Sequence, residues 1–331
     1  MDHPVMLAEA AACPVCGGGE LNTLRRLRFD HPGDGGDFVD IRYERLWILF
    51  ERLLPGERSR VFRVDRCAAC GFIFTNPRFT HEAMAAKYEA IEELGSVKLR
   101  QAAYPPTGLD LRARALYEEC EQARRNVAGA RRWESVLDYG GAWGYMLEPF
   151  SRAGLRCCVV DYEDWAGNRP AQIEYLGREL ADLPAEEHFD IILLLYTLEH
   201  AVEPVGMLKS LVAHLRPGGM LVVEVPLGCV DEYRRLVDPI THLNFFSEES
   251  LVRAFAEAGL GVVRVATGFQ THYGPGFFGI TAVGSTGAPI RPPAPWSTRA
   301  QAGPALGLYY RLRGRAPGLV RRVRRALRRG R

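Results

Sequence analysis

From residue 136 onward, short continuous runs of apolar residues alternate with longer stretches in which apolar residues recur at helical spacing. Strands that are apolar on both faces are typical of a parallel sheet covered by helices on both sides. The pattern therefore predicts an α/β fold with a doubly wound sheet, whose ligands bind at the carboxyl ends of the strands. The runs that indicate strands are VLDYG (136–140), CCVVDYE (157–163), QIEYLG (172–177), FDIILLLY (189–196) and MLVVEVP (220–226).

A glycine-rich turn follows the first of these predicted strands. In LDYGGAWGYM (137–146), Asp138 stands two residues before Gly140 and Gly141, and Gly144 follows. Glycines at a strand-to-helix turn allow the backbone to approach a bound cofactor closely. An ordinary tight turn would fit the same letters, so the turn alone does not decide between the two interpretations.

The residues around the turn favour one cofactor over another. No register of the glycines fits the Gly-x-Gly-x-x-Gly pattern of a dinucleotide site, and Asp138 would place a carboxylate close to a phosphate. A cofactor with an ammonium, a sulfonium and no phosphate fits better, and S-adenosylmethionine is such a molecule. Asp161 ends the second strand, where a carboxylate can accept hydrogen bonds from both ribose hydroxyls.

Two Cys-x-x-Cys pairs precede the predicted sheet. CPVCGG supplies Cys13 and Cys16, and CAACGF supplies Cys67 and Cys70. Two such pairs place four thiolates tetrahedrally around one zinc ion and leave no position open for chemistry, which predicts a structural zinc in a ribbon-like domain. The alternative is two unrelated redox-active or buried pairs. Between the pairs, the sequence IRYERLWILFERLL (41–54) predicts an inserted amphipathic helix.

The segments that follow the turn extend the pattern. FDIILLLYTLEHAVEP (189–204), LRPGGMLVVEVP (215–226) and THLNFFSEESLVRAFAEAGL (241–260) occur in the order and spacing of class I methyltransferases, so residues 111–285 resemble that family. The resemblance implies a seven-stranded sheet whose last two strands are GVVRVATG (261–268) and FFGITAVG (277–284).

The resemblance also implies roles for single residues. The turn from Asp138 to Gly144 would hold the methionine end of the cofactor, and Asp161 would hold its ribose. Glu179, just before LADLP, matches the acidic position that contacts the adenine amine. Ala142 replaces the usual third glycine of the turn, which should tighten it.

The amino-terminal part narrows the resemblance. CAACGFIFTNPRFTHEAMAAKYEA (67–90) is similar to the ribbon end and linker of the sugar C-methyltransferases of deoxysugar biosynthesis and their polysaccharide-cluster relatives. Those enzymes also join a four-cysteine zinc module to a class I domain. The acceptor implied by this resemblance is a nucleotide-linked or carrier-linked sugar.

Two histidines are candidates for a general base. His200 ends the fourth predicted strand in YTLEH, and His242 follows the fifth in THLNFF. A neutral imidazole suits this role near physiological pH, although Leu-Glu-His also recurs in class I enzymes where the pair only shapes the pocket. Both histidines match the sugar C-methyltransferase pattern, whereas Pro239 and Thr241 replace its Tyr and Glu, which leaves oxygen methylation open. Further candidates for the acceptor pocket are Tyr43, Trp47, Tyr196, His272 and Tyr273.

Charge divides the chain into an acidic body and a basic tail. Residues 258–331 carry 13 arginines and no Asp or Glu, which leaves −11 for the first 257 residues because the whole chain carries +2. Residues 311–331 hold ten of these arginines, with apolar residues at helical spacing, and could lie on an anionic membrane surface or bind an acidic partner. A disordered solubilising tail is the plainer interpretation.

The start of the chain carries acids and no Lys or Arg before Arg25, unlike a secretory signal. We therefore expect a cytoplasmic protein, peripheral at the inner membrane surface if the tail binds there. The predicted organisation is a zinc-binding module (1–80), a linker (81–110), a methyltransferase domain (111–285), and a Pro/Gly-rich linker with the basic tail (286–331).

The sequence thus predicts an S-adenosylmethionine-dependent methyltransferase that acts on a small polar acceptor, with a sugar as the first candidate. A natural-product O- or C-methyltransferase is the alternative. A nucleic-acid methyltransferase that grips with its zinc module and tail is disfavoured, because the acidic body would repel phosphates. A scaffold that binds the cofactor without catalysis is disfavoured by the presence of Asp138, Asp161 and His200.

Overall fold

The computed structural model describes residues 5–98, 108–127, 132–228, 233, 236–270 and 277–290. The Arg-rich tail, most of the predicted linker before it, and the candidates His272 and Tyr273 lie outside these residues. Among the described residues, no helix is long and apolar enough to cross a membrane.

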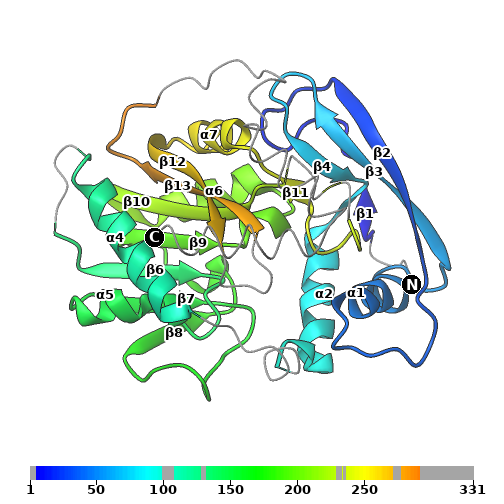
Figure 1. Cartoon of the computed structure of the whole chain (residues 1–331), viewed down its shortest axis with the longest axis horizontal. Helices are drawn as coiled ribbons and strands as arrows, with labels where there is room; N and C mark the ends of the chain where they lie inside the picture. The colour runs from blue at the N-terminus through cyan, green and yellow to red at the C-terminus, as the bar shows by residue number, and fades with distance from the viewer. Residues whose placement is uncertain are drawn as a thin grey trace, which may run out of the picture.

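A seven-stranded sheet forms the centre of the larger part of the molecule (Figure 1). Its first five strands along the chain run parallel, and the last strand pairs antiparallel with both of its neighbours. The predicted seven-stranded α/β sheet is therefore confirmed, including both carboxy-terminal strands. In spatial order the strands are β12 (Gly261–Gln270), β13 (Phe277–Ser285), β10 (Leu215–Pro226), β9 (Phe189–Leu195), β6 (Ser135–Tyr139), β7 (Arg156–Val160) and β8 (Ile173–Gly177).

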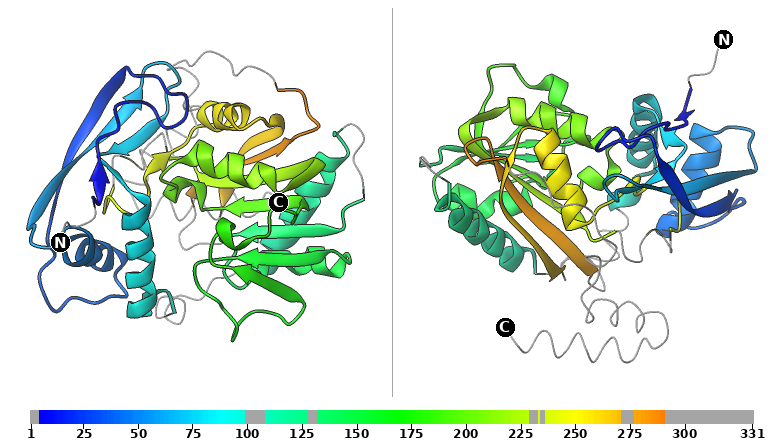
Figure 2. Two further views of the ribbon diagram at one scale, coloured as in Figure 1. Left: turned by 180° about the vertical axis from the view of Figure 1, so that it is seen from behind. Right: turned by 90° about the horizontal axis from the view of Figure 1, so that it is seen from above.

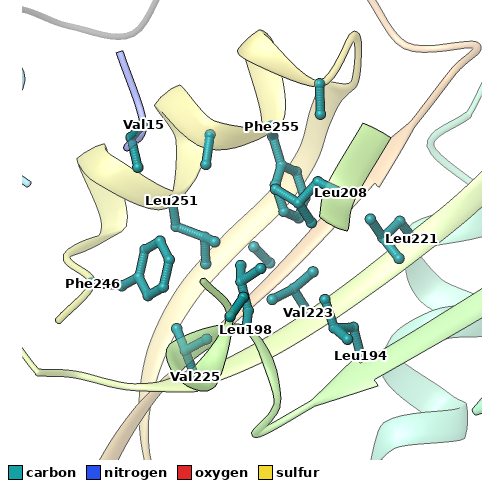
Figure 3. Packing of buried hydrophobic residues seen from close by; sticks show 14 of the residues in the cluster. Val15, Leu194, Leu198, Leu208, Leu221, Val223, Val225, Phe246, Leu251 and Phe255 are labelled. Carbon is teal, nitrogen blue, oxygen red and sulfur yellow. The ribbon is translucent and has the colours of Figure 1, made fainter. Parts of the chain in front are cut away.

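Helices cover both faces of this sheet, as the continuous apolar strands predict. Alternate residues of β9 point to opposite faces, so Ile191 and Leu193 join one core cluster and Ile192 and Leu194 join another. The first cluster is closed by α4 (Leu109–Arg124) and α5 (Glu148–Arg152), and the second by α6 (Pro204–Ala213) and α7 (Glu248–Glu257). Figure 3 shows side chains of α6 and α7 packed over β10 in the second cluster.

The amino-terminal module lies to one side of the large sheet (Figure 2). It contains a sheet of β2 (Leu21–Asp30), β3 (Ser59–Cys67), β4 (Ile73–Asn76) and β11 (Asn244–Phe245). Because β11 comes from the segment that follows β10, one strand of the module is supplied by the carboxy-terminal half of the chain. A short pair, β1 (Leu7–Ala8) and β5 (Arg78–Phe79), completes the strands of the module.

The helix expected at 41–54 is present between the two cysteine pairs. It begins as α1 (Ile41–Ile48), capped by the Asp40 side chain, and continues as the π-helical turn η1 (Leu49–Leu53). Residues of the predicted linker form a second helix, α2 (His81–Leu94), which begins at the Thr80 cap. Helices α1 and α2 stand beside each other, and α2 lies between α1 and the large sheet (Figure 1).

Candidate active site

The four cysteines of the two pairs come together in one cluster. Their sulfurs all lie within 4.8 Å of one another, with Cys13–Cys70 and Cys16–Cys67 separations of 3.6 Å. A regular tetrahedron with Zn–S bonds of about 2.3 Å has edges of about 3.8 Å. The hydrogen bond between Cys70 and Cys13 lowers the pKa of the Cys13 thiol to about 6 and raises that of Cys70, so one thiolate of this pair forms readily at neutral pH. The donor set and its spacing therefore fit zinc.

The glycine turn brings the backbone against Asp138 and against the end of β9. A Cβ atom at Gly141 would lie 2.4 Å from Asp138 Cγ, and one at Gly140, whose φ is +75°, would lie 2.6 Å from Thr197 Oγ1. Side chains are therefore excluded at both positions. Gly144, also at positive φ, precedes the 3₁₀ turn η2 (Tyr145–Leu147).

Asp138 is a buried carboxylate with neither oxygen hydrogen-bonded to any described residue. Burial and the charge of Asp161 raise its pKa to about 7. A buried carboxylate without a partner is costly, and an ammonium or sulfonium cation would offset that cost. The residues present thus fit the methionine end of S-adenosylmethionine.

Asp161, at the end of β7, ties the glycine turn to the next strand. Its carboxylate accepts hydrogen bonds from the backbone N–H of Ala142 (2.9 Å) and of Glu163 (3.2 Å), and burial raises its pKa. Ala142 has φ of +49°, so it adopts the left-handed conformation that the usual glycine would favour. Each Asp161 oxygen keeps a further lone pair for a ribose hydroxyl.

Glu179 follows β8 and is exposed. Its side chain accepts from the backbone N–H of Asp182 and caps the turn η3 (Leu180–Asp182). With Asp138, near the end of β6, and Asp161, just after β7, it places an acidic residue at the carboxyl end of each of three neighbouring parallel strands, in the order expected for the cofactor's methionine, ribose and adenine parts.

His200 and His242 lie side by side although 41 residues separate them, with ring centroids 5.0 Å apart. His200 ends the 3₁₀ turn η4 (Leu198–His200), and its Nδ1–H donates to the carbonyl of Thr241. This hydrogen bond leaves the lone pair on Nε2, which lies 3.7 Å from a carboxylate oxygen of Glu199. The structure therefore brings both predicted bases together.

Burial and neighbouring charges keep His200 neutral. Its pKa lies well below the usual 6.5 because of desolvation and the charges of His242 and Lys87. A neutral imidazole with a free Nε2 can accept a proton from an acceptor at physiological pH.

The amino-terminal module holds the segment that carries His242. Leu243 donates its N–H to the Glu199 carbonyl (2.9 Å), and the Leu243 carbonyl accepts from Thr75 of β4 (3.0 Å). Arg78 donates to the carbonyls of Ala201 and Val202, just after η4. Both histidine segments are thus positioned by residues more than 100 positions away in sequence, which no local pattern could reveal.

Glu199 is a site residue that the sequence analysis did not single out. Its carboxylate and the imidazoles of His200 and His242 place ligand atoms within 4.8 Å of one another, a spacing that is also compatible with a divalent cation. A base and a metal ligand differ in their response to chelators, which distinguishes the two roles.

The remaining candidates take other positions. Tyr43 donates to the Gly33 carbonyl, and both Tyr43 and Trp47 pack edge-on against Phe38, where they form an aromatic cluster of the module's own. Tyr196, with φ of +54°, packs against Phe277 of β13. Among the α1 side chains, Arg45 carries a charge that lowers the pKa of His200.

Replacing Asp138 by asparagine should stabilise the cofactor-free protein while weakening S-adenosylmethionine binding. The carboxyl pKa is raised from 3.8 to about 7 on folding, so the folded state binds more protons between those values and its stability falls as pH rises from about 4 to 7. Asparagine does not ionise, so the variant does not lose stability as the pH rises. Its melting temperature should therefore exceed the wild-type value at pH 8 and match it near pH 4. Equal melting temperatures at pH 8 would contradict a buried, ionised Asp138.

Comparison with known proteins adds a family and several relatives. A family model described as "Methyltransferase domain" matches residues 99–265, just over half of the chain. The chain is 31% identical over 158 residues to "Ubiquinone biosynthesis O-methyltransferase" of Nitrobacter winogradskyi, covering 41% of this chain and 58% of that protein. A protein of the same description from Bradyrhizobium diazoefficiens is 32% identical over 118 residues, covering 31% and 45%. The chain spans about half of the length of these curated relatives.

The chain is also similar to a solved structure. It is 1,6-didemethyltoxoflavin-N1-methyltransferase of Burkholderia thailandensis with bound 1,6-didemethyltoxoflavin and S-adenosylhomocysteine. The TM-score is 0.47 at 16% identity, and the match covers 65% of this chain and 94% of that chain.

Proposed function

The chain belongs to the methyltransferase domain family, and from this premise we propose that it transfers the methyl group of S-adenosylmethionine to a small polar acceptor. The observation that carries the proposal is the contact between the glycine turn and Thr197. Gly140 packs against Thr197, which precedes His200 by three residues, so the predicted cofactor turn lies close to the segment that carries His200. A methyl donor held by the turn and a base at His200 would then face one acceptor.

Each acidic residue of the strand ends has a part in this proposal. Asp138 would hold the ammonium of the cofactor, Asp161 its ribose and Glu179 its adenine, and the cofactor supplies an electrophilic methyl group when bound. The nucleophilic atom of the acceptor would form the bond to the methyl carbon, and His200 Nε2 would take the proton that this atom loses. His242 would share this role or orient the acceptor.

A nucleotide-linked or carrier-linked sugar is the acceptor we propose. The support is the resemblance of the four-cysteine module and its connection to those of sugar C-methyltransferases. Methylation of a hydroxyl on another small molecule is the second candidate, and it is favoured by the relatives described as ubiquinone biosynthesis O-methyltransferases.

The metal proposed for the four-cysteine cluster is a structural zinc, since four protein ligands fill a tetrahedral site. We propose that the arginine-rich segment 311–331 binds an anionic membrane surface or an acidic partner. Neither role is needed for the chemistry at His200.

The acceptor can be identified with a labelled donor. The full chain is incubated with S-adenosylmethionine that carries a trideuterated methyl group and with panels of nucleotide sugars, other small molecules that carry hydroxyl groups, and nucleic acids, and the products are analysed by mass spectrometry. Label in a sugar supports the first candidate, and label in another hydroxyl-bearing small molecule supports the second. Label only in nucleic acid or protein would overturn both.

Replacing Asp161 by alanine should weaken S-adenosylhomocysteine binding by about 1.5–3 kcal/mol, because hydrogen bonds to a charged group are lost. Isothermal titration calorimetry measures this directly. Asp164→Ala, an exposed neighbour on the same turn, is the matched control and should leave the affinity unchanged. An equal loss in both variants would assign the effect to the turn's conformation instead of the carboxylate.

A further inference from the structure

Two basic side chains of helices α1 and α2 are buried. Arg45 of α1 is 8% exposed and Lys87 of α2 is 2% exposed. Charged side chains are rarely buried to this degree without partners that satisfy them.

Both cations act on the segment that carries the predicted bases. Lys87 Nζ donates to the carbonyl of Ile240 (3.1 Å), next to Thr241, whose carbonyl accepts from His200. Burial and the charge of Arg45 lower the pKa of Lys87 to about 7, and the charges of both groups lower the pKa of His200. Lys87 therefore contacts the segment of the histidine pair, and the charge of Arg45 acts on both Lys87 and His200.

Arg45 and Lys87 carry more N–H donors than the described residues around them provide hydrogen-bond acceptors. Arg45 Nε and Nη1 make no hydrogen bond to any described residue, and the carboxylate oxygen of Glu44 that pairs with Nη1 lies 3.5 Å away, too long for a good hydrogen bond. Lys87 has one carbonyl acceptor for three donors, together with the Tyr88 ring at 4.4 Å.

Two buried carboxylates nearby, those of Glu44 and Asp238, are already engaged. Glu44 accepts a short hydrogen bond from Ser96. Asp238 accepts from the backbone N–H groups of Ile240 and Thr241 and from the Thr241 hydroxyl, so it closes its own turn. Neither carboxylate provides the several acceptor oxygens that the two cations lack.

We propose that Arg45 and Lys87 bind an oxyanion, a carboxylate or a phosphate, carried by the acceptor beside His200 and His242. A guanidinium presents a planar fork of donors that matches such an anion, and an ammonium adds a point charge. This proposal rests on the proposed function and narrows it to anionic acceptors. It also gives the amino-terminal module a direct part in selecting them.

The test uses the full chain loaded with S-adenosylhomocysteine. Inorganic phosphate, benzoate and the neutral benzamide are titrated calorimetrically at constant ionic strength. One or both anions should bind and benzamide should not, and the preferred anion identifies the group as phosphate or carboxylate. Arg45→Gln and Lys87→Met should each weaken the anion about tenfold or more. Arg42→Gln, exposed on the same helix, and Lys209→Met, exposed on α6, are the matched controls and should leave binding unchanged.

Three results would overturn the inference: no anion binding by the wild type, equal binding of benzamide, or unchanged anion affinity in both variants. If Arg45→Gln does not fold, Arg45→Lys keeps the charge and loses the fork, and it should still weaken the anion measurably. Affinity for S-adenosylhomocysteine, recorded in the same samples, tests the proposed function separately. Retained cofactor binding without anion binding overturns only the present inference.

Discussion

Replacing His200 by asparagine is expected to lower turnover by about 10²–10⁴-fold while the affinity for S-adenosylhomocysteine stays unchanged. Asparagine keeps a donor for the Thr241 carbonyl that Nδ1 of His200 now contacts, but it has no basic nitrogen at the Nε2 position. Turnover is measured with the acceptor found in the labelling experiment, and cofactor affinity is measured by calorimetry.

The pH dependence separates a base from a residue that only shapes the site. Because the pKa of His200 is held well below 6.5, the wild-type base stays neutral and turnover should be flat from about pH 6.5 upward, with its acid limb at lower pH. The limb should disappear in His200→Asn.

His242→Asn gives the comparison within the pair, since the two rings lie 5.0 Å apart. If both variants keep full turnover, positioning alone suffices or another residue is the base. Loss of wild-type turnover in EDTA, restored by a divalent cation, would assign Glu199 and the two histidines to a metal instead.

Replacing Cys67 by serine should lower the zinc content from about one ion per chain and reduce the melting temperature by about 10 °C or more. The four cysteines are part of the protein's core. Cys13, Cys67 and Cys70 belong to the same buried hydrophobic cluster as Leu251 and Phe255 of α7. Figure 3 shows Val15, from between two of the ligands, beside this helix. Loss of the metal would therefore loosen packing against the large sheet as well.

The control for this variant is Cys120→Ser, which replaces an equally buried cysteine of α4 outside the cluster. This variant should lower the melting temperature by only a few degrees and leave the zinc content unchanged. Elemental analysis and thermal melting measure the two effects. A metal-free wild-type protein that melts at the same temperature as a zinc-supplemented one would rule out a structural zinc.

The large sheet could be predicted from the sequence because its signals are local. Runs such as FDIILLLY are almost wholly apolar, which is typical of a strand covered on both faces, and the turn after β6 has glycines where side chains would collide. The four cysteines were predictable for a similar reason, since the spacing within each pair fixes which sulfurs can converge.

The composition of the active site was only partly predictable. His200 and His242 are recognisable by type and position, but their juxtaposition depends on β11 joining the amino-terminal sheet, a pairing between residues about 170 positions apart. Arg45 and Lys87 appear in sequence as ordinary charged positions of two helices. Their burial follows from the packing of α1 and α2 near the segment of Ile240, which no periodicity encodes.

The most direct test is a crystal structure of the full chain with S-adenosylhomocysteine. The proposed site predicts the ligand along the carboxyl ends of β6, β7 and β8, with its ammonium within hydrogen-bond distance of Asp138, its ribose at Asp161 and its sulfur on the side of His200 and His242. A ligand bound elsewhere, or one whose sulfur faces away from both histidines, would contradict the proposed active site.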